Sequence, residues 1–128
     1  MATLTGAILI SLGKRTAGLF SNNDELASKI TACSVAFNEP VWRMPIPEEI
    51  AEGMEGKVSD LNSINTANGC GSGSAAAFLR MFIEDGVKWA HIDIAGAAVS
   101  NTNFGNFNQY GATGFGIGIL LEYFSKHQ

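Results

Sequence analysis

The chain has 128 residues, which allows one domain at most. Its net charge is −4 and its longest basic cluster is Lys14–Arg15, which argues against nucleic-acid binding. No apolar run reaches the roughly 20 residues of a membrane span, and the N-terminus does not resemble a signal peptide. Neither Cys33 nor Cys70 lies in a zinc-binding spacing. Charged residues make up only 16%, against about 25% in typical domains, so we expect further protein to cover part of this chain.

The first half of the chain predicts two strands and a helix. The apolar run Ala7–Leu12 is expected to be a buried strand, and Gly18–Phe20 a second, short one. Asn22 or Asn23 is expected to cap the helix that follows. Its apolar positions fall on one helix face and are Leu26, Ile30, Cys33 and Phe37.

The second half predicts three more helices and one long strand. Val41–Met44 is short and extended, and Pro47 opens a helix that ends near Gly53 and Gly56. The elements expected after these are a helix over Ser74–Glu84, a strand over Trp89–Ala95, a loop over 101–110 and a final helix over Gly114–Lys126. This order indicates an α/β fold with helices covering a mostly parallel sheet. Two long strands are too few for a stable sheet, so the remainder of the sheet is expected to lie outside this chain.

A carboxylate stands in the middle of the strand predicted over Trp89–Ala95. Buried carboxylates are rare unless paired or hydrogen-bonded, so Asp93 is expected to accept hydrogen bonds from backbone or hydroxyl groups. His91 shares its face of the strand, and the pair could bind a metal, but no third ligand lies nearby. We therefore expect His91 to be a structural histidine with its hydrogen bonds satisfied. Gly96 would let the backbone approach a ligand or another element closely.

Other motifs have simpler explanations than catalysis. The acidic run Glu48, Glu49, Glu52 and Glu55 fits a solvated helix face. The glycine-rich stretch 69–74 lacks the ending of a P-loop, and 114–118 lacks the strand that precedes a dinucleotide-binding turn.

Five blocks resemble one protein family. They are Trp89–Gly96 (WAHIDIAG), Ala2–Ala7 (ATLTGA), Pro40–Pro45 (PVWRMP), Val58–Ile64 (VSDLNSI) and Ala112–Gly116 (ATGFG). In type, order and spacing these blocks resemble leucyl aminopeptidases, which are the two-metal exopeptidases of the cytosol aminopeptidase family. The resemblance covers nearly the whole chain. It implies that residues 1–128 are the C-terminal portion of the catalytic domain, a partial three-layer α/β/α structure with a mostly parallel sheet.

The resemblance also implies which residues contact substrate. Thr3, Leu4 and Gly6 match the segment that holds the peptide through backbone groups, and Ala95 and Ala98 match the wall of the pocket for the N-terminal side chain. The family's Asn-Thr-Asp-Ala-Glu-Gly-Arg block, its metal-binding Lys and its Asp ligands do not occur in this sequence. We therefore expect no catalytic residue and no metal ligand in this chain, although the parent enzyme would use two divalent ions, zinc or manganese.

The chain is expected to supply substrate-pocket walls of an enzyme that removes N-terminal residues from peptides. The parent protein would be a cytoplasmic metalloaminopeptidase that forms a homo-oligomer, a hexamer in the family, without nucleic-acid or membrane partners. The chain alone is expected to be inactive. The alternative is a non-catalytic assembly or interaction module of the same fold, and a small nucleotide-binding domain is a third, weaker possibility.

Overall fold

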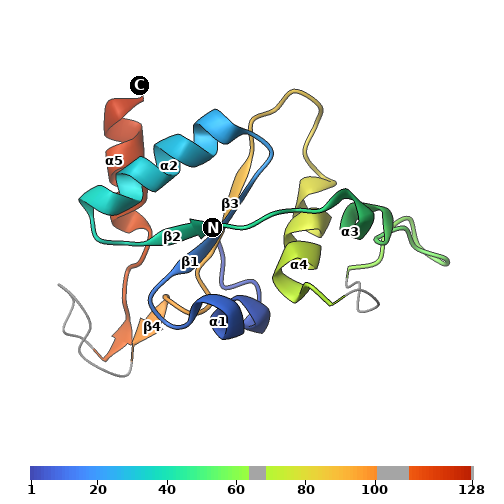
Figure 1. Ribbon diagram of the computed structural model, residues 1–128, viewed down its shortest axis with the longest axis horizontal. Helices are drawn as coiled ribbons and strands as arrows, with labels where there is room; N and C mark the ends of the chain where they lie inside the picture. Colours follow the sequence, from blue (N-terminus) through green and yellow to red (C-terminus); the bar gives the residue numbers. More distant parts are fainter. Residues whose placement is uncertain (64–68, 101–109, 128) are drawn as a thin grey trace.

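The computed structural model describes residues 1–63, 69–100 and 110–127. The chain forms short helices and strands, with a small sheet at its centre (Figure 1). In chain order they are α1 (Gly6–Leu12), β1 (Ala17–Ser21), α2 (Asp24–Ala36), β2 (Val41–Arg43), α3 (Glu48–Glu52), α4 (Gly71–Arg80), β3 (Ala90–Asp93), β4 (Val99–Ser100), β5 (Gly111–Ala112) and α5 (Ile117–Lys126).

The central sheet is mixed, with strand order β2-β1-β3. β1 runs parallel to β2 and antiparallel to β3, with Gly18 opposite Asp93. β4 and β5 form a separate antiparallel pair. The prediction of a mostly parallel sheet is therefore wrong for the described residues. Both β1 and β3 are buried on both faces, and such strands carry no pattern that reveals their relative direction.

Helices lie on both faces of the sheet. Leu19 of β1 and Ile92 of β3 pack with Ile30 of α2 and Ile119 of α5 on one face. Phe20 points to the other face, where it packs with Ile8 of α1 and Ala76 of α4. Two small apolar layers thus enclose the sheet, and Figure 1 shows α2 and α5 together on one side of it.

The apolar run 7–12 is a helix, where a strand was predicted. Thr5 caps it by accepting a hydrogen bond from the Ile8 amide at 3.2 Å. Gly13 ends it at a φ of 73°, a conformation that favours glycine. Ile8 is fully buried whereas Ile10 is 89% exposed, so only one face of the helix packs inward. A six-residue apolar run fits a buried strand and a buried helix equally well, and here the cap decides.

The other helices and strands lie close to their predicted positions. Asn23 caps α2 through the Leu26 amide at 2.8 Å, and Ile30 and Cys33 face the core as expected. α4 begins at Gly71 and ends at Arg80, earlier than predicted at both ends, and α5 begins later, at Ile117. Most of the loop predicted over 101–110 lies outside the described residues.

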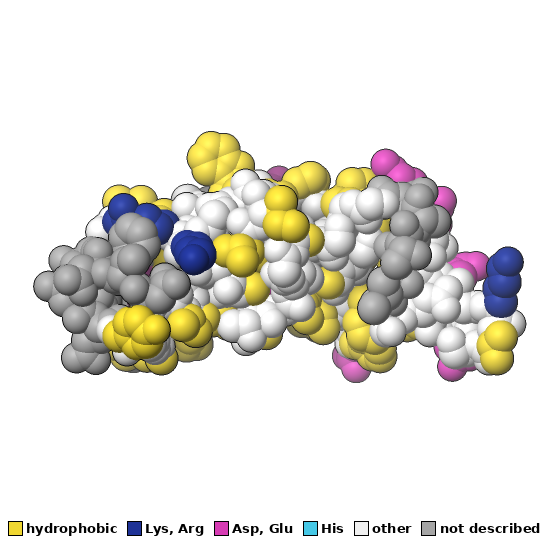
Figure 2. Space-filling model, turned by 90° about the horizontal axis from the view of Figure 1, so that it is seen from below, with side chains coloured by type: hydrophobic (Ala, Val, Ile, Leu, Met, Phe, Trp, Pro, Cys, Tyr) yellow, Lys and Arg dark blue, Asp and Glu magenta, His cyan; other side chains and the backbone are white. Residues whose placement is uncertain are grey.

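Many large hydrophobic side chains remain on the surface. Figure 2 shows hydrophobic side chains spread along the length of one face, with few charged groups between them. The outer side of α5 contributes Ile117, Leu121 and Phe124, each at least 60% exposed. This exposure agrees with the low charge of the sequence. Among the described residues, no helix is long and apolar enough to cross a membrane.

Candidate substrate-binding site

Asp93, the last residue of β3, connects two chain segments that the sequence separates widely. Its carboxylate is fully buried. Oδ1 accepts hydrogen bonds from the amides of Leu4 at 3.0 Å, Thr5 at 3.4 Å and Ala95 at 3.2 Å. Oδ2 accepts one from the Thr5 hydroxyl at 2.7 Å. The prediction that Asp93 accepts backbone and hydroxyl hydrogen bonds in the core is confirmed.

Every one of these partners is a donor, which suits an ionised carboxylate because it only accepts. The Thr5 hydroxyl accepts from the Ile8 amide, so its single proton is available for Asp93. One carboxylate thereby joins the end of β3 to the start of α1. Hydrogen bonds to charged groups are shorter and stronger than neutral ones, so this junction is well defined.

The predicted residues Thr3, Leu4 and Gly6 lie along this junction. The segment pairs with β3 through Ala2, whose amide donates to the Ile92 carbonyl at 3.1 Å and whose carbonyl accepts from the Ile94 amide at 2.9 Å. Asp93 already uses the Leu4 amide. No described residue hydrogen-bonds the Leu4 carbonyl or the Gly6 amide. Thr3, Leu4 and Gly6 are exposed.

Ala95 and Ala98 belong to the turn that follows β3. The amides of Ala97 and Ala98 both donate to the Ile94 carbonyl, at 3.0 and 2.9 Å, which tightens the turn. The structure brings Ala95 close to Leu4, because both amides bind the same Asp93 oxygen. Ala98 lies at the far end of the turn, where its carbonyl accepts from the Thr113 amide at 2.9 Å. Both alanine side chains are partly buried.

Gly96 allows this turn to pack against the end of α1, as the sequence predicted. A Cβ placed on Gly96 would lie 2.2 Å from the Gly13 carbonyl oxygen. Any larger residue would push the turn away from α1. Glycine is therefore required here for close approach of two backbones.

His91 is buried, but the prediction that its hydrogen bonds are satisfied is wrong. Its Nε2 atom has no hydrogen-bond partner among the described residues. The ring stacks instead against Phe20 and Trp89, with centroids 6.2 and 6.4 Å away. Burial lowers the pKa of His91 below its ordinary value of 6.5, the N-terminal ammonium lowers it further, and Asp93 opposes both effects.

The described residues do not fit a metal centre. Over 1–63, 69–100 and 110–127, no three His, Cys, Asp or Glu side chains are placed to hold a metal ion. The four hydrogen bonds of Asp93 also occupy the carboxylate that a His91–Asp93 metal pair would need. The two divalent ions that the resemblance implies therefore find no site in this part of the chain.

The remaining motifs form ordinary structure. Residues 71–74 of the glycine-rich stretch make the first turn of α4. The glutamates around α3 are exposed, as predicted for a solvated face.

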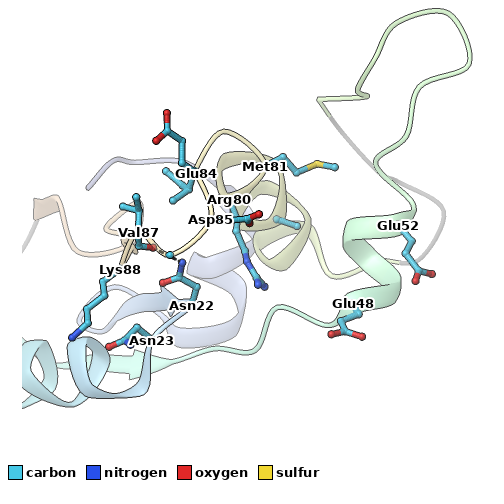
Figure 3. A pocket seen from close by; sticks show the side chains of 13 residues that line it. Asn22, Asn23, Glu48, Glu52, Arg80, Met81, Glu84, Asp85, Val87 and Lys88 are labelled. Carbon is cyan, nitrogen blue, oxygen red and sulfur yellow. Dashed lines mark hydrogen bonds between the residues drawn. The ribbon is translucent and has the colours of Figure 1, made fainter.

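A cavity of about 790 Å³ lies away from the predicted residues, between α3, α4 and the end of β1. Figure 3 shows Arg80 extending into it from α4, with Glu48 and Glu52 on α3 to one side and Asn22 and Asn23 on the other. None of the five predicted substrate-binding residues lines this cavity.

Sequence reasoning missed two threonines that organise the site. Thr5 ties α1 to Asp93, and the Thr113 hydroxyl donates to the Ala97 carbonyl at 2.6 Å. A threonine placed before an apolar run is a recognisable helix cap, so Thr5 could have been identified. Thr113 lies 16 residues from Ala97 in the sequence, and no local pattern indicates that they are partners.

Comparison with known proteins identifies the family of the chain. The model of the cytosol aminopeptidase family, catalytic domain, matches residues 1–121. The cytosol aminopeptidase of Rickettsia prowazekii is 44% identical over 99% of this chain, and the probable cytosol aminopeptidase of Chlorobium phaeobacteroides is 44% identical over 98%. A solved mutant of tomato leucine aminopeptidase superposes with a TM-score of 0.87 over 98% of this chain, at 37% identity.

The matches cover only part of each relative. The chain spans 25% of the Rickettsia prowazekii protein, 24% of the Chlorobium protein and 23% of the tomato chain. The family model matches nearly all of this chain, and this match establishes the family. The chain belongs to the cytosol aminopeptidase family and corresponds to part of its catalytic domain.

Proposed function

We propose that this chain supplies part of the substrate-binding site of a leucyl aminopeptidase, which removes N-terminal residues from peptides. The observation that carries the proposal is the junction at Asp93. The amides of Leu4 and Ala95 bind the same Asp93 oxygen, so the two residues lie close together. By resemblance, both match substrate-contacting positions of the family. By the same resemblance the chain is the C-terminal portion of the catalytic domain.

The chemistry of the junction suits a peptide's N-terminal residue. The Leu4 carbonyl can accept a hydrogen bond from the peptide main chain, and the Gly6 amide can donate one. Such backbone contacts hold a peptide without reading its side chain. Side-chain preference then depends on the walls, where small residues such as Ala95 and Ala98 leave space for a leucine-sized group.

The chemical step itself requires groups that this chain does not hold in its described part. We propose that two divalent ions, zinc or manganese, are bound by other parts of the enzyme and none by this chain. Paired ions of this kind activate water and polarise a carbonyl. The contribution of this chain is to bind and orient the peptide, so the chain alone is inactive.

We also propose the cellular setting that the family suggests. The relatives carry the name cytosol aminopeptidase, which supports a cytoplasmic location. Family membership supports a homo-oligomer, with six subunits by resemblance. Peptides are the proposed ligands, whereas nucleic acid and membranes are not.

A chimera tests the proposal. This chain replaces the matching quarter of the Rickettsia prowazekii cytosol aminopeptidase, and hydrolysis of leucine p-nitroanilide is measured with added manganese or zinc. The chimera is expected to be active and the chain alone inactive. Turnover by the isolated chain above a denatured control, or a folded and metal-loaded chimera without turnover, would contradict the proposal.

The alternative, a non-catalytic assembly module, is favoured by one observation, the exposed apolar side of α5. The same chimera distinguishes the two functions. A chimera that assembles and binds metal but hydrolyses nothing would support the assembly module.

A further inference from the structure

The hydrogen bonds of Asp93 connect Leu4 and Thr5 to Ala95 at the proposed substrate site. We propose that Asp93, together with Thr5, is a positioning pair that holds the peptide-binding backbone at Leu4 and Gly6 in register with the pocket wall at Ala95. This inference rests on the proposed function. It assigns a role to two residues that touch no substrate themselves.

A single oxygen atom of Asp93 holds the Leu4 backbone close to the Ala95 backbone. Asp93 Oδ1 accepts from the Leu4 amide at 3.0 Å and from the Ala95 amide at 3.2 Å. Since both amides point at one atom, the Leu4 peptide group cannot slide relative to Ala95 without losing a charge-assisted hydrogen bond. The other carbonyl and amide groups of the site follow from this placement.

Thr5 extends the arrangement to Gly6. Its hydroxyl donates to Asp93 Oδ2 at 2.7 Å and accepts from the Ile8 amide at 3.2 Å. Gly6 is the first residue of α1, directly after Thr5, so the direction of its amide depends on this cap. The same carboxylate therefore determines the positions of the Leu4 carbonyl, the Gly6 amide and the Ala95 side chain.

Attachment of the N-terminal segment to the sheet does not require Asp93. The backbone of Ala2 already pairs with Ile92 and Ile94 on β3. Asp93 acts beyond this pairing, at the residues proposed to meet the peptide. A carboxylate with no exposed surface is costly to bury, and at Asp93 four hydrogen-bond donors from Leu4, Thr5 and Ala95 offset that cost. This location favours positioning over simple packing.

Substitutions separate positioning from folding. Asp93→Asn keeps the size of the side chain but removes its negative charge and replaces one acceptor oxygen by an NH2 group. Thr5→Val removes the hydroxyl at nearly constant volume, whereas Thr5→Ser retains it. Glu39→Gln is the matched control, because Glu39 is a second buried carboxylate that accepts from a backbone amide, that of Ile119, on the opposite helix layer.

Steady-state kinetics of the chimera give the first readout. Loss of an oriented binding contact raises KM, while loss of folded protein lowers the apparent kcat and leaves KM unchanged. Asp93→Asn and Thr5→Val are expected to raise KM for leucine p-nitroanilide about tenfold, and Thr5→Ser to restore most of the affinity. Glu39→Gln is expected to leave KM unchanged. Unchanged KM in both Asp93→Asn and Thr5→Val would overturn the inference.

Amide hydrogen exchange of the isolated chain gives a second readout that needs no activity. Asp93→Asn is expected to speed exchange at Leu4 and Ala95 about tenfold relative to Leu19 on β1, and Glu39→Gln to leave that ratio unchanged. Equal acceleration at all three amides would show a purely global role and overturn the inference. If the unsubstituted chimera is inactive, the proposed function fails on its own, and the exchange ratio still decides whether Asp93 positions Leu4.

Discussion

The carboxylate of Glu39 accepts a hydrogen bond from the Ile119 amide at 2.9 Å, so a residue just before β2 caps the first turn of α5. Glu39 is only 6% exposed, and its charge lies at the N-terminal end of the helix, where a negative charge is favourable. The neighbouring Gly118 adds to this contact, because a Cβ there would lie 2.5 Å from the Phe37 ring. α5 is thus fixed to the rest of the chain at its start.

Removal of this cap is expected to destabilise the protein. Glu39→Ala leaves the Ile119 amide buried without a partner and should lower the free energy of unfolding by about 1–3 kcal/mol. Urea denaturation measures the change, with Glu49→Ala on exposed α3 as the control. Equal midpoints for the two variants would show that the cap contributes nothing.

Stability should fall on mild acidification because of His91. The folded protein binds a proton at His91 less readily than the unfolded chain, since burial lowers the pKa. The contribution of His91 is therefore fully present above about pH 6.5 and is lost progressively as the pH drops from there toward the lowered pKa. Asp93 and the N-terminal ammonium are the charged groups that act on this equilibrium.

The urea midpoint, compared at pH 7.5 and pH 5.5, measures this dependence. His91→Phe should flatten it, because an aromatic ring of similar size can still stack on Phe20 and Trp89 without taking up a proton. His127→Gln on the exposed end of α5 should leave the slope as it is. A slope that survives His91→Phe would assign the effect to other groups.

Gly96→Ala should disturb the turn that carries Ala95. The added methyl group would meet the Gly13 carbonyl, a backbone atom that cannot rotate away. We expect a loss of about 1–3 kcal/mol in unfolding free energy. Gly6→Ala is the control, since a Cβ there meets nothing within 4 Å. Thermal melting compares the two, and an unchanged melting temperature for Gly96→Ala would contradict the packing described here.

The isolated chain should associate through the outer side of α5. Ile117, Leu121 and Phe124 are 60, 63 and 61% exposed and follow one helical stripe. An exposed apolar stripe of this kind favours contact with a second copy. Size-exclusion chromatography with light scattering should show species above 13.5 kDa at micromolar concentration.

Leu121→Glu should shift that distribution toward the monomer. Ile10→Glu, which changes an exposed apolar residue on α1 outside this stripe, should not. A single monomer peak for the unsubstituted chain would remove the basis for self-association.

The sequence predicted those elements whose signals are local. α2 has a capping asparagine and a clear apolar face, and Ile30 and Cys33 are buried as the pattern requires. Asp93 was identified because a carboxylate inside an apolar strand must find donors. In both cases the physical requirement and the residue type lie in the same few positions.

Other features depend on contacts that no short pattern contains. Nothing within β1 or β3 indicates that they pair antiparallel. The run 7–12 suits a strand as well as a helix, and only the cap at Thr5, outside the run, favours the helix. Most buried polar atoms have hydrogen-bond partners, and the sequence predicts the same for His91. The neighbours of the His91 ring are instead the rings of Phe20 and Trp89, which offer Nε2 no partner. The five predicted substrate residues came from family resemblance, and the structure brings together Leu4 and Ala95 most directly.

Substrate preference tests the proposed pocket wall most directly. In the chimera, Ala95→Leu should fill the space proposed for the substrate side chain, and the ratio of kcat/KM for alanine over leucine p-nitroanilide should rise about tenfold or more. The ratio is independent of how much enzyme is folded. A ratio that stays at the value of the unsubstituted chimera, with both substrates affected equally, would contradict the assignment of Ala95 to the pocket.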